Sequence, residues 1–222
     1  MKKMNFEKLA SVLPEYPGIL SKDEYFNSAV LIPLVEMNNE HCFLFEKRSA
    51  NIRQGGEICF PGGEFDSNID KTMEDTAIRE TIEELGIYRE KIKKIGCLDT
   101  FVGPMGVTVD SVIAKLELSN LEEIKYDENE VEKIFTVPVS FFIENPPEIY
   151  GMRLELHSYY LNEKGEKIDL LPVKQLGLPQ RYSKSRQGKK HNVYVYKHNS
   201  EIIWGITAAL IFEFVKKVEK IL

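Results

Sequence analysis

The chain has 222 residues, 43% of them hydrophobic and 29% charged, and is long enough to bury about 70% of its unfolded surface without disulfides. Its 29 Lys and Arg residues face 35 Asp and Glu residues, and the net charge of −6 argues against broad neutralisation of nucleic-acid phosphates. The usual domain size of roughly 150 residues favours one domain with extensions. We predict a single domain over 1–222, extended by an N-terminal helix at 4–13 and a C-terminal helix at 202–221.

The cysteines and the apolar runs indicate the cellular setting. Cys42, Cys59 and Cys97 lie in apolar runs without a Cys-x-x-Cys pair, which predicts buried thiols in a reducing compartment. No stretch approaches the ~18 apolar residues of a membrane span, and Glu7 and Lys8 interrupt the apolar N-terminal segment. We expect a cytoplasmic protein without nucleic-acid or membrane partners. Each terminal helix could pack within a monomer or across a homodimer, and the sequence leaves both open.

Hydrophobic periodicity and turn residues predict alternating strands and helices. The predicted strands are 28–37, 41–47, 58–60, 92–101, 107–116, 152–160 and 192–196. Between the terminal helices we expect a helix at 72–85 and a short one at 139–143. Residues 48–70 form a glycine-rich loop region, and 122–132 form an acidic linker. Strands mixed with a few helices predict an α/β sandwich with a mixed sheet.

The helix at 72–85 carries the residues with the clearest chemistry. It begins after a threonine suited to the N-cap and ends at a glycine suited to C′. At about 100° per residue, its isoleucines and leucine share one face and its carboxylates share the other. That acidic face carries Glu80, Glu83 and Glu84. We therefore expect one face to pack and the other to present three carboxylates.

Three carboxylates at this spacing repel one another by a few tenths of a kcal/mol per pair. No lysine lies four residues further along to relieve the repulsion, and a glycine-rich loop comes directly before the helix. A solvated Glu-rich face is the plain structural interpretation. The functional interpretation is a site for a hard divalent cation, Mg²⁺ or Mn²⁺, which takes oxygen ligands.

The same residues resemble a known motif. Gly63 and the segment Arg79–Ile87 (RETIEELGI) are similar to the Nudix box, G-x5-E-x7-R-E-U-x-E-E-x-G-U, in which U is apolar. Thr81 stands at the first U, and the spacing from Gly63 to the arginine is two residues longer than in the pattern. The first Glu of the pattern stays unassigned, with three acidic residues as stand-ins: Asp66, Asp70 and Glu74.

The preceding loop resembles one branch of this superfamily. Residues 47–63 are similar to the coenzyme A diphosphatase signature L-L-T-x-R-S-x3-R-x3-G-x3-F-P-G-G, with Phe45-Glu46 in place of L-T and one residue fewer between Arg53 and Gly56. Residues 98–102 and 203–209 resemble the same branch. The resemblance implies a Nudix-type α/β/α sandwich with a mixed β-sheet. It also implies a hydrolase that splits coenzyme A or its thioesters into 3′,5′-ADP and 4′-phosphopantetheine.

The resemblance implies roles for the helix residues. Glu80 and Glu84 are metal ligands, and Glu83 is a third ligand or the base that takes the proton of the attacking water. Arg79 orients the Glu80 carboxylate through a charge-assisted fork. Gly63 offers its backbone carbonyl to the metal.

Residues outside the helix complete the predicted site. Gly62 lets the backbone approach the ligands closely. Arg48 and Arg53 match the arginines of the signature and would grip the substrate phosphates. The basic residues at 184–191 could meet the 3′-phosphate of coenzyme A, or they are a solvated loop. An acidic residue of a later loop, Glu128 or Glu130, could serve as the base instead.

Two further functions remain open at this point. The same metal site could cleave NADH, ADP-ribose or a nucleoside triphosphate, because specificity lies in loops outside the motif. From another class, a catalytically silent Nudix fold could sense a ligand, although all three helix glutamates are present. In each enzymatic case the partner is a small nucleotide-diphosphate substrate, with Mg²⁺ or Mn²⁺ as cofactor.

Overall fold

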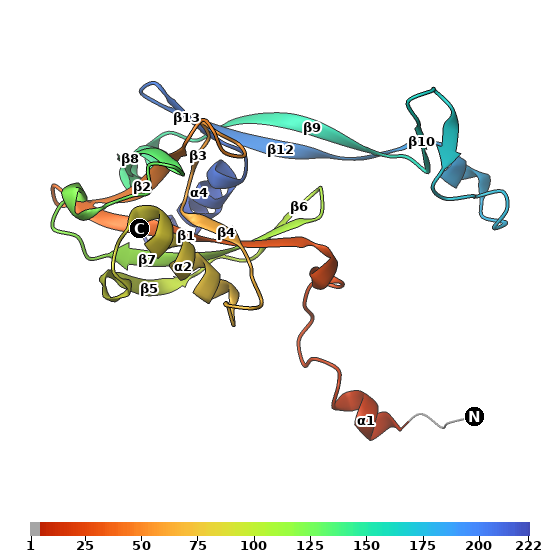
Figure 1. Cartoon of the computed structure of the whole chain (residues 1–222), viewed down its shortest axis with the longest axis horizontal. Helices are drawn as coiled ribbons and strands as arrows, with labels where there is room; N and C mark the ends of the chain where they lie inside the picture. Colours follow the sequence, from red (N-terminus) through yellow and green to blue (C-terminus); the bar gives the residue numbers. More distant parts are fainter. Residues whose placement is uncertain (1–4) are drawn as a thin grey trace.

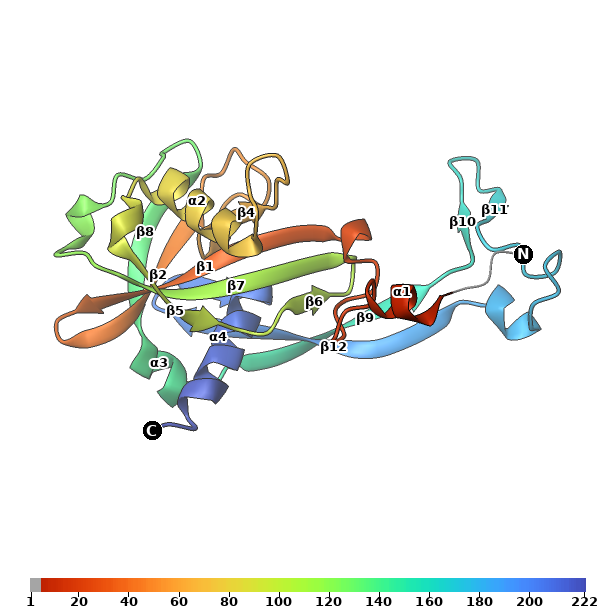
Figure 2. The same cartoon turned by 90° about the horizontal axis from the view of Figure 1, so that it is seen from below.

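The computed structural model describes residues 5–222, which form a mixed sheet with helices on both faces (Figures 1 and 2). The strands of this sheet are β1 (Phe26–Met37), β2 (Glu40–Arg48), β3 (Ile58–Cys59), β4 (Gly62–Glu64), β5 (Ile92–Cys97), β6 (Phe101–Gly103), β7 (Val107–Leu116) and β8 (Val131–Pro138). Their order is β3-β2-β1-β7-β5, with β8 on β2, β4 on β1 and β6 on β7. Strands β1 and β7 are parallel and the other pairs are antiparallel.

The helices lie on opposite faces of the sheet, as Figure 2 shows. Helix α2 (Met73–Leu85) covers one face, and helices α3 (Val139–Glu144) and α4 (Gly205–Val218) cover the other. Alternate side chains of β1 enter the two cores, so that Leu31 packs in the cluster under α2 and Ile32 in the cluster under α4. The predicted α/β/α sandwich with a mixed sheet is confirmed.

Aromatic packing holds the glycine-rich loop against the sheet. Phe60, which lies just before β4, stacks on Phe45 of β2 with ring centroids 4.9 Å apart. Phe43 on the same strand contacts Phe214 of α4, with centroids 5.0 Å apart. These rings belong to the core on the α4 face. This packing fixes the position of the chain just before β4, from which it continues toward α2.

A second sheet extends from the first. Strand β9 (Glu148–Leu156) pairs antiparallel with β12 (Arg186–His198), and β13 (Glu201–Trp204) pairs with the other edge of β12. The ribbon of β9 and β12 projects beyond the main sheet and ends near the hairpin of β10 (Tyr159–Leu161) and β11 (Lys167–Asp169) (Figure 1). The sequence predicted shorter strands here, around a long irregular segment.

Several predicted boundaries differ from the observed ones. The C-terminal helix begins at Gly205, because residues 202–204 pair with β12 as part of β13. The predicted strand 92–101 divides into β5 and β6, and β8 occupies residues assigned partly to the acidic linker. Four short 3-10 turns complete the chain: η1 (Lys22–Glu24), η2 (Arg89–Lys91), η3 (Leu121–Glu123) and η4 (Gln180–Ser183).

The N-terminal helix α1 spans Phe6–Ala10 and is capped by the Asn5 side chain; residue 4 of the predicted helix lies outside the described residues. In the part of the chain that is described, no helix is long and apolar enough to cross a membrane. Cys42 is buried and Cys59 is half-buried, whereas Cys97 is exposed, so the prediction of three buried thiols was wrong for Cys97.

Candidate functional site

Local interactions fix both ends of α2. The Thr72 hydroxyl accepts from the Asp75 backbone N–H at 3.1 Å, and the Asp75 carboxylate accepts from the Thr72 N–H at 2.9 Å, which forms a capping box. Gly86 ends the helix in the left-handed conformation, with φ of 60°. Inside the helix, buried Thr81 donates its hydroxyl hydrogen to the Ala77 carbonyl. A threonine is therefore tolerated at an apolar position of the motif.

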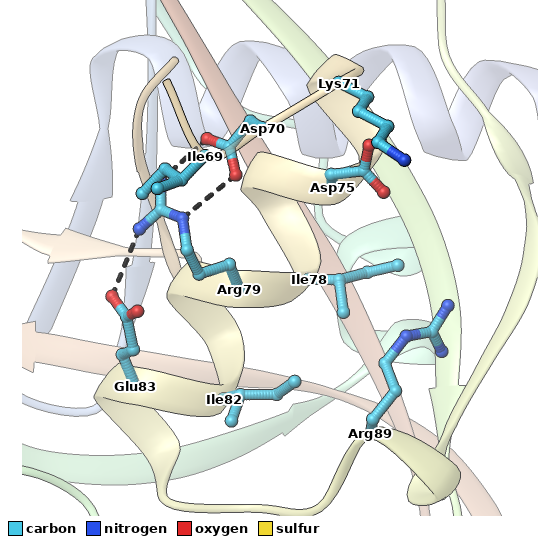
Figure 3. Close-up of a pocket in the computed structure, with 9 residues that line it drawn as sticks. All are labelled: Ile69, Asp70, Lys71, Asp75, Ile78, Arg79, Ile82, Glu83 and Arg89. Atoms are coloured by element: carbon cyan, nitrogen blue, oxygen red, sulfur yellow. Dashed lines mark hydrogen bonds and ion pairs between the residues drawn. The ribbon is translucent and has the colours of Figure 1, made fainter. Parts of the chain in front are cut away.

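Arg79, in the middle of α2, is the centre of an ionic clamp (Figure 3). Its Nε donates to Asp70 Oδ1 at 3.0 Å and its Nη2 to Asp70 Oδ2 at 2.9 Å, a bidentate pair. Its Nη1 donates to Glu80 Oε1 at 2.7 Å and to Glu83 Oε2 at 3.1 Å. One guanidinium therefore links the loop before the helix to two carboxylates of the predicted site.

Of the three stand-ins for the first Glu of the pattern, Asp70 is the one that contacts Arg79. Its side chain is 2% exposed, and Thr76 also donates to it at 2.9 Å. Hydrogen bonds from Arg79 lower the pKa of Asp70 to about 2. The other two stand-ins are occupied elsewhere, because Asp66 accepts from Asn68 and Glu74 pairs with Lys94. From the sequence spacing alone, any of these three acidic residues could have taken the place of the first Glu of the pattern.

The three helix glutamates do not share one solvent-facing surface. Glu84 is 3% exposed and accepts from the Gly62 N–H at 2.9 Å. The Glu80 carboxylate lies against Gly63, where an added Cβ would collide with it. The Glu83 side chain remains 58% exposed and turns to Arg79. The expectation of an exposed acidic face was therefore wrong for Glu84, because β4 passes directly over that side of the helix.

A fourth carboxylate lies beside this pair, and the sequence analysis did not identify it. Glu46 on β2 is 1% exposed, and its Oε1 accepts from the Cys59 thiol at 3.2 Å. Its Oε2 has no hydrogen-bond partner among the described residues. A buried carboxylate oxygen without a partner is costly unless a cation or proton satisfies it. The one sequence signal that could have identified Glu46 was its position as a charged residue directly after the apolar residues of β2.

Burial and mutual repulsion raise the pKa values of the inner carboxylates. Burial raises the pKa of Glu46 to about 7, with further contributions from Glu130 and Glu80. Burial, with Glu46 as the nearest like charge, raises the pKa of Glu84 to about 9. Burial also raises the pKa of Glu80. The cluster therefore favours bound protons or cations. Asp70 differs, because Arg79 lowers its pKa and keeps it ionised.

The two predicted phosphate-binding arginines differ in position. Arg48 is half-buried beside Glu46 and Glu84, and its pKa is raised through Cys59 and these carboxylates, although burial acts against this. Arg53 is exposed, and its guanidinium lies over the Phe26 ring, 6.0 Å from the centroid. The two residues meet through the Arg48 Nε, which donates to the Arg53 carbonyl at 3.2 Å. The structure brings Arg48, and not the Arg53 guanidinium, to the acidic cluster.

Later segments were predicted to contribute a base and a basic patch. Glu130 lies close enough to Glu46 and Glu80 to raise their pKa values, and its carbonyl accepts from the Ser49 N–H. The basic residues at 184–191 lie in the projecting ribbon (Figure 1). Among the two predicted alternative bases, Glu130 is the one whose charge reaches the cluster.

The residues present fit a divalent cation, although no group of three His, Cys, Asp or Glu side chains within residues 5–222 is already arranged around one point. The unpartnered Glu46 Oε2 needs a positive partner. The glycine at Gly63 leaves space beside Glu80 that a side chain would fill. The donor set consists of carboxylate and carbonyl oxygens, which suit Mg²⁺ and Mn²⁺ and not soft metals.

A shallow cavity of about 420 Å³ lies on the outer side of the clamp (Figure 3). Asp70, Arg79 and Glu83 form one wall, and Ile78, Ile82 and Arg89 form another. The inner carboxylates can hold cations, and Arg79 can keep the Glu80 carboxylate in position. The Arg48 guanidinium, beside these carboxylates, can bind an anion.

Comparisons with known proteins place the chain in a family. A family model described as NUDIX domain matches residues 26–151. The Nudix hydrolase NudL of Photorhabdus laumondii is 30% identical over 208 residues, which cover 93% of this chain and 92% of that protein. Nudix hydrolase 3 of Caenorhabditis elegans is 34% identical over 149 residues, or 64% of this chain and 61% of that protein. A MutT/nudix family structure from Enterococcus faecalis covers 98% of this chain and 70% of that one, with 18% identity and a TM-score of 0.48.

Proposed function

Because the chain belongs to the Nudix family and is a Nudix hydrolase of nucleoside diphosphate derivatives, we propose that it cleaves the diphosphate of coenzyme A or its thioesters with Mg²⁺ or Mn²⁺. The products would be 3′,5′-ADP and 4′-phosphopantetheine. The observation that carries the proposal is the inward turn of Glu80 and Glu84 onto the Gly62–Gly63 backbone, beside the unpartnered carboxylate oxygen of Glu46.

The proposed cation ligands are Glu80, Glu84, Glu46 and the Gly63 carbonyl, with Glu83 as a further ligand or as the base. When bound, the cations would polarise the phosphoryl oxygens and lower the pKa of a bound water. Buried carboxylates with raised pKa values support this, since a cation can replace the protons that otherwise neutralise them.

The protein's own residues would orient the reaction. Arg79 holds Glu80 and Glu83 at fixed positions, and Asp70 in turn holds Arg79. Burial of Glu84 under β4 keeps that carboxylate away from bulk water. A base on the outer edge, Glu83 or Glu130, is exposed and can pass a proton to solvent.

The substrate preference is proposed from the loop that leads into the site. Residues 47–63 carry the resemblance to the coenzyme A signature and place Arg48 next to the carboxylates. A diphosphate carries negative charge, so an acidic cluster can bind it only through bridging cations and a nearby guanidinium. Arg48 supplies that guanidinium.

A panel of substrates tests the proposal. Hydrolysis of coenzyme A, NADH, ADP-ribose and 8-oxo-dGTP is measured with Mn²⁺, with and without chelator, for the wild type and Glu84→Gln. We expect coenzyme A to turn over fastest, with loss of activity in chelator and in the variant. Arg48→Gln should raise KM for coenzyme A more than it lowers kcat, since it would bind substrate phosphate.

Two outcomes would change the conclusion. A preference for NADH of about tenfold or more over coenzyme A would replace the substrate and keep the metal site, because such a ratio equals about 1.4 kcal/mol of transition-state binding. If no compound turns over faster than with Glu84→Gln, the chain is a ligand-sensing Nudix fold instead.

A further inference from the structure

The projecting ribbon carries charge of opposite sign to the rest of the chain. Residues 148–198, here called the arm, contain ten Lys and Arg residues against five Asp and Glu residues, a net charge of +5. Residues 26–147 and 199–222, here called the body, contain 15 against 26, a net charge of −11. Within the arm, 170–198 holds seven basic residues and no acidic ones. The net charge of −6 for the whole chain does not reveal that the arm is basic and the body acidic.

The arm also exposes many large apolar side chains. They come from β9, β10 and β11 and from the segment that joins β11 to β12. These exposed residues are Ile149, Tyr150, Met152, Leu156, Tyr160, Leu161, Ile168, Leu170, Leu171, Leu176 and Leu178. With roughly 100 Å² accessible on each, they offer about 1,000 Å² of apolar surface, within the range that one partner contributes to a stable interface.

Within residues 5–222, the arm is anchored to the body at its base. Tyr194 of β12 stacks on Phe212 of α4 with ring centroids 4.5 Å apart, and β13 pairs with residues 195–198. Toward the tip, β12 has β9 as its single strand partner among the described strands. A two-stranded ribbon with both faces in water is marginally stable, so the outer arm needs a covering surface.

We propose that the outer arm docks onto the body of a second copy of this chain, in a two-fold symmetric dimer. Beyond its base, the arm extends away from its own body in both views, so this outer part does not cover that body's sheet or helices (Figures 1 and 2). Two arms, each with a charge of +5, would repel one another if they packed together. The body with its charge of −11 is the complementary surface, and a two-fold axis makes the contact twice.

The first experiment measures molecular mass by light scattering and by sedimentation over a range of concentrations. The chain has a mass of 25.6 kDa, so we expect about 51 kDa for the wild type. The arm variants are Lys184→Glu with Lys189→Glu, and Met152→Ser with Leu156→Ser, all at exposed positions. Each double variant should weaken dimerisation by about tenfold or more and leave the circular dichroism spectrum unchanged.

A matched control carries the same change of charge outside the arm. Lys93→Glu with Lys220→Glu alters two exposed lysines of the body. Because the body is already acidic, this variant should keep or strengthen the dimer. Added salt should weaken the wild-type dimer more than it weakens the charge-reversed arm variant, since fewer charge pairs remain there to be screened.

A second experiment identifies the surface that the arm contacts. Protein labelled with ¹⁵N is mixed with unlabelled protein, and a zero-length carbodiimide reagent links lysines to nearby carboxylates. We expect links of mixed isotope between arm lysines, such as Lys184 and Lys189, and carboxylates of the body. This readout does not require the arm variants to fold.

Three results would overturn the proposal. A wild-type mass of about 26 kDa at all concentrations would show that no second copy binds. Arm-to-body links of a single isotope would show that the arm folds over its own body. A dimer that persists unchanged in both arm variants would place the interface elsewhere. Hydrolytic activity is measured separately, and its presence or absence decides none of these outcomes.

Discussion

Replacing Asp70 with Asn tests the ionic clamp directly. The change keeps the shape of the side chain but removes the charge that binds Arg79 at 2.9 and 3.0 Å. Hydrogen bonds from Arg79 in first place, and also from Thr76 and the Asp66 backbone, lower the pKa of Asp70 from 3.8 to about 2, and this shift corresponds to about 2.5 kcal/mol of stability above pH 5. We therefore expect Asp70→Asn to lower the free energy of unfolding by about 2.5 kcal/mol at pH 7.

The stability difference between wild type and Asp70→Asn should depend on pH in a defined direction. A carboxyl whose folded pKa is lowered stabilises the fold above its unfolded pKa of 3.8, and this stability is lost as pH falls through about 2. The difference between wild type and variant should therefore shrink to roughly 1.3 kcal/mol at pH 3. Urea unfolding followed by circular dichroism at pH 7, 4 and 3 measures it. The activity should also fall, by about tenfold in kcat, because Arg79 positions Glu80 and Glu83.

The control is an exposed aspartate in a single ion pair. The Asp99 side chain is 94% exposed and accepts from Lys217 at 3.1 Å, so Asp99→Asn should cost less than about 0.5 kcal/mol at every pH. Equal losses in the two variants, or a gap for Asp70→Asn that stays constant from pH 7 to 3, would refute the clamp as the source of this stability.

Three other predictions concern the inner carboxylates. Glu84→Gln should lower activity by about a thousandfold, yet raise the stability of metal-free protein in urea unfolding at pH 8, because a carboxyl whose folded pKa is raised to about 9 costs stability as pH rises above its unfolded pKa of 4.5. Gly62→Ala should lower Tm because its Cβ meets β1 backbone, whereas Gly63→Ala should keep Tm and lose activity by displacing the Glu80 carboxylate. Mn²⁺ binding at pH 7 should release protons, fewer in Glu46→Gln, as calorimetry in buffers of different ionisation enthalpy would show.

The regular elements of the main sheet could be predicted because their signals are local. Apolar runs bounded by turn residues placed β1 and β7 within two residues of their observed bounds, and the capping residues placed α2. Strand β8 was not predicted at all, because its first residues, including Glu132 and Lys133, follow an acidic run. The strand forms there because β2 supplies seven cross-strand partners. No local pattern contains that information.

The sequence alone determined the identity of the acidic helix, its caps and its motif, because these depend on residues three to seven positions apart. Tertiary structure alone decided which acids meet. Glu46 lies near Glu84, 38 residues further along, because β2 pairs with β1 and α2 packs on β1. Of the three stand-ins, Asp70 is the one that Arg79 binds. Side-chain burial depends on the segment that covers it. Glu84 was expected to face solvent, but it is buried because β4 lies over it.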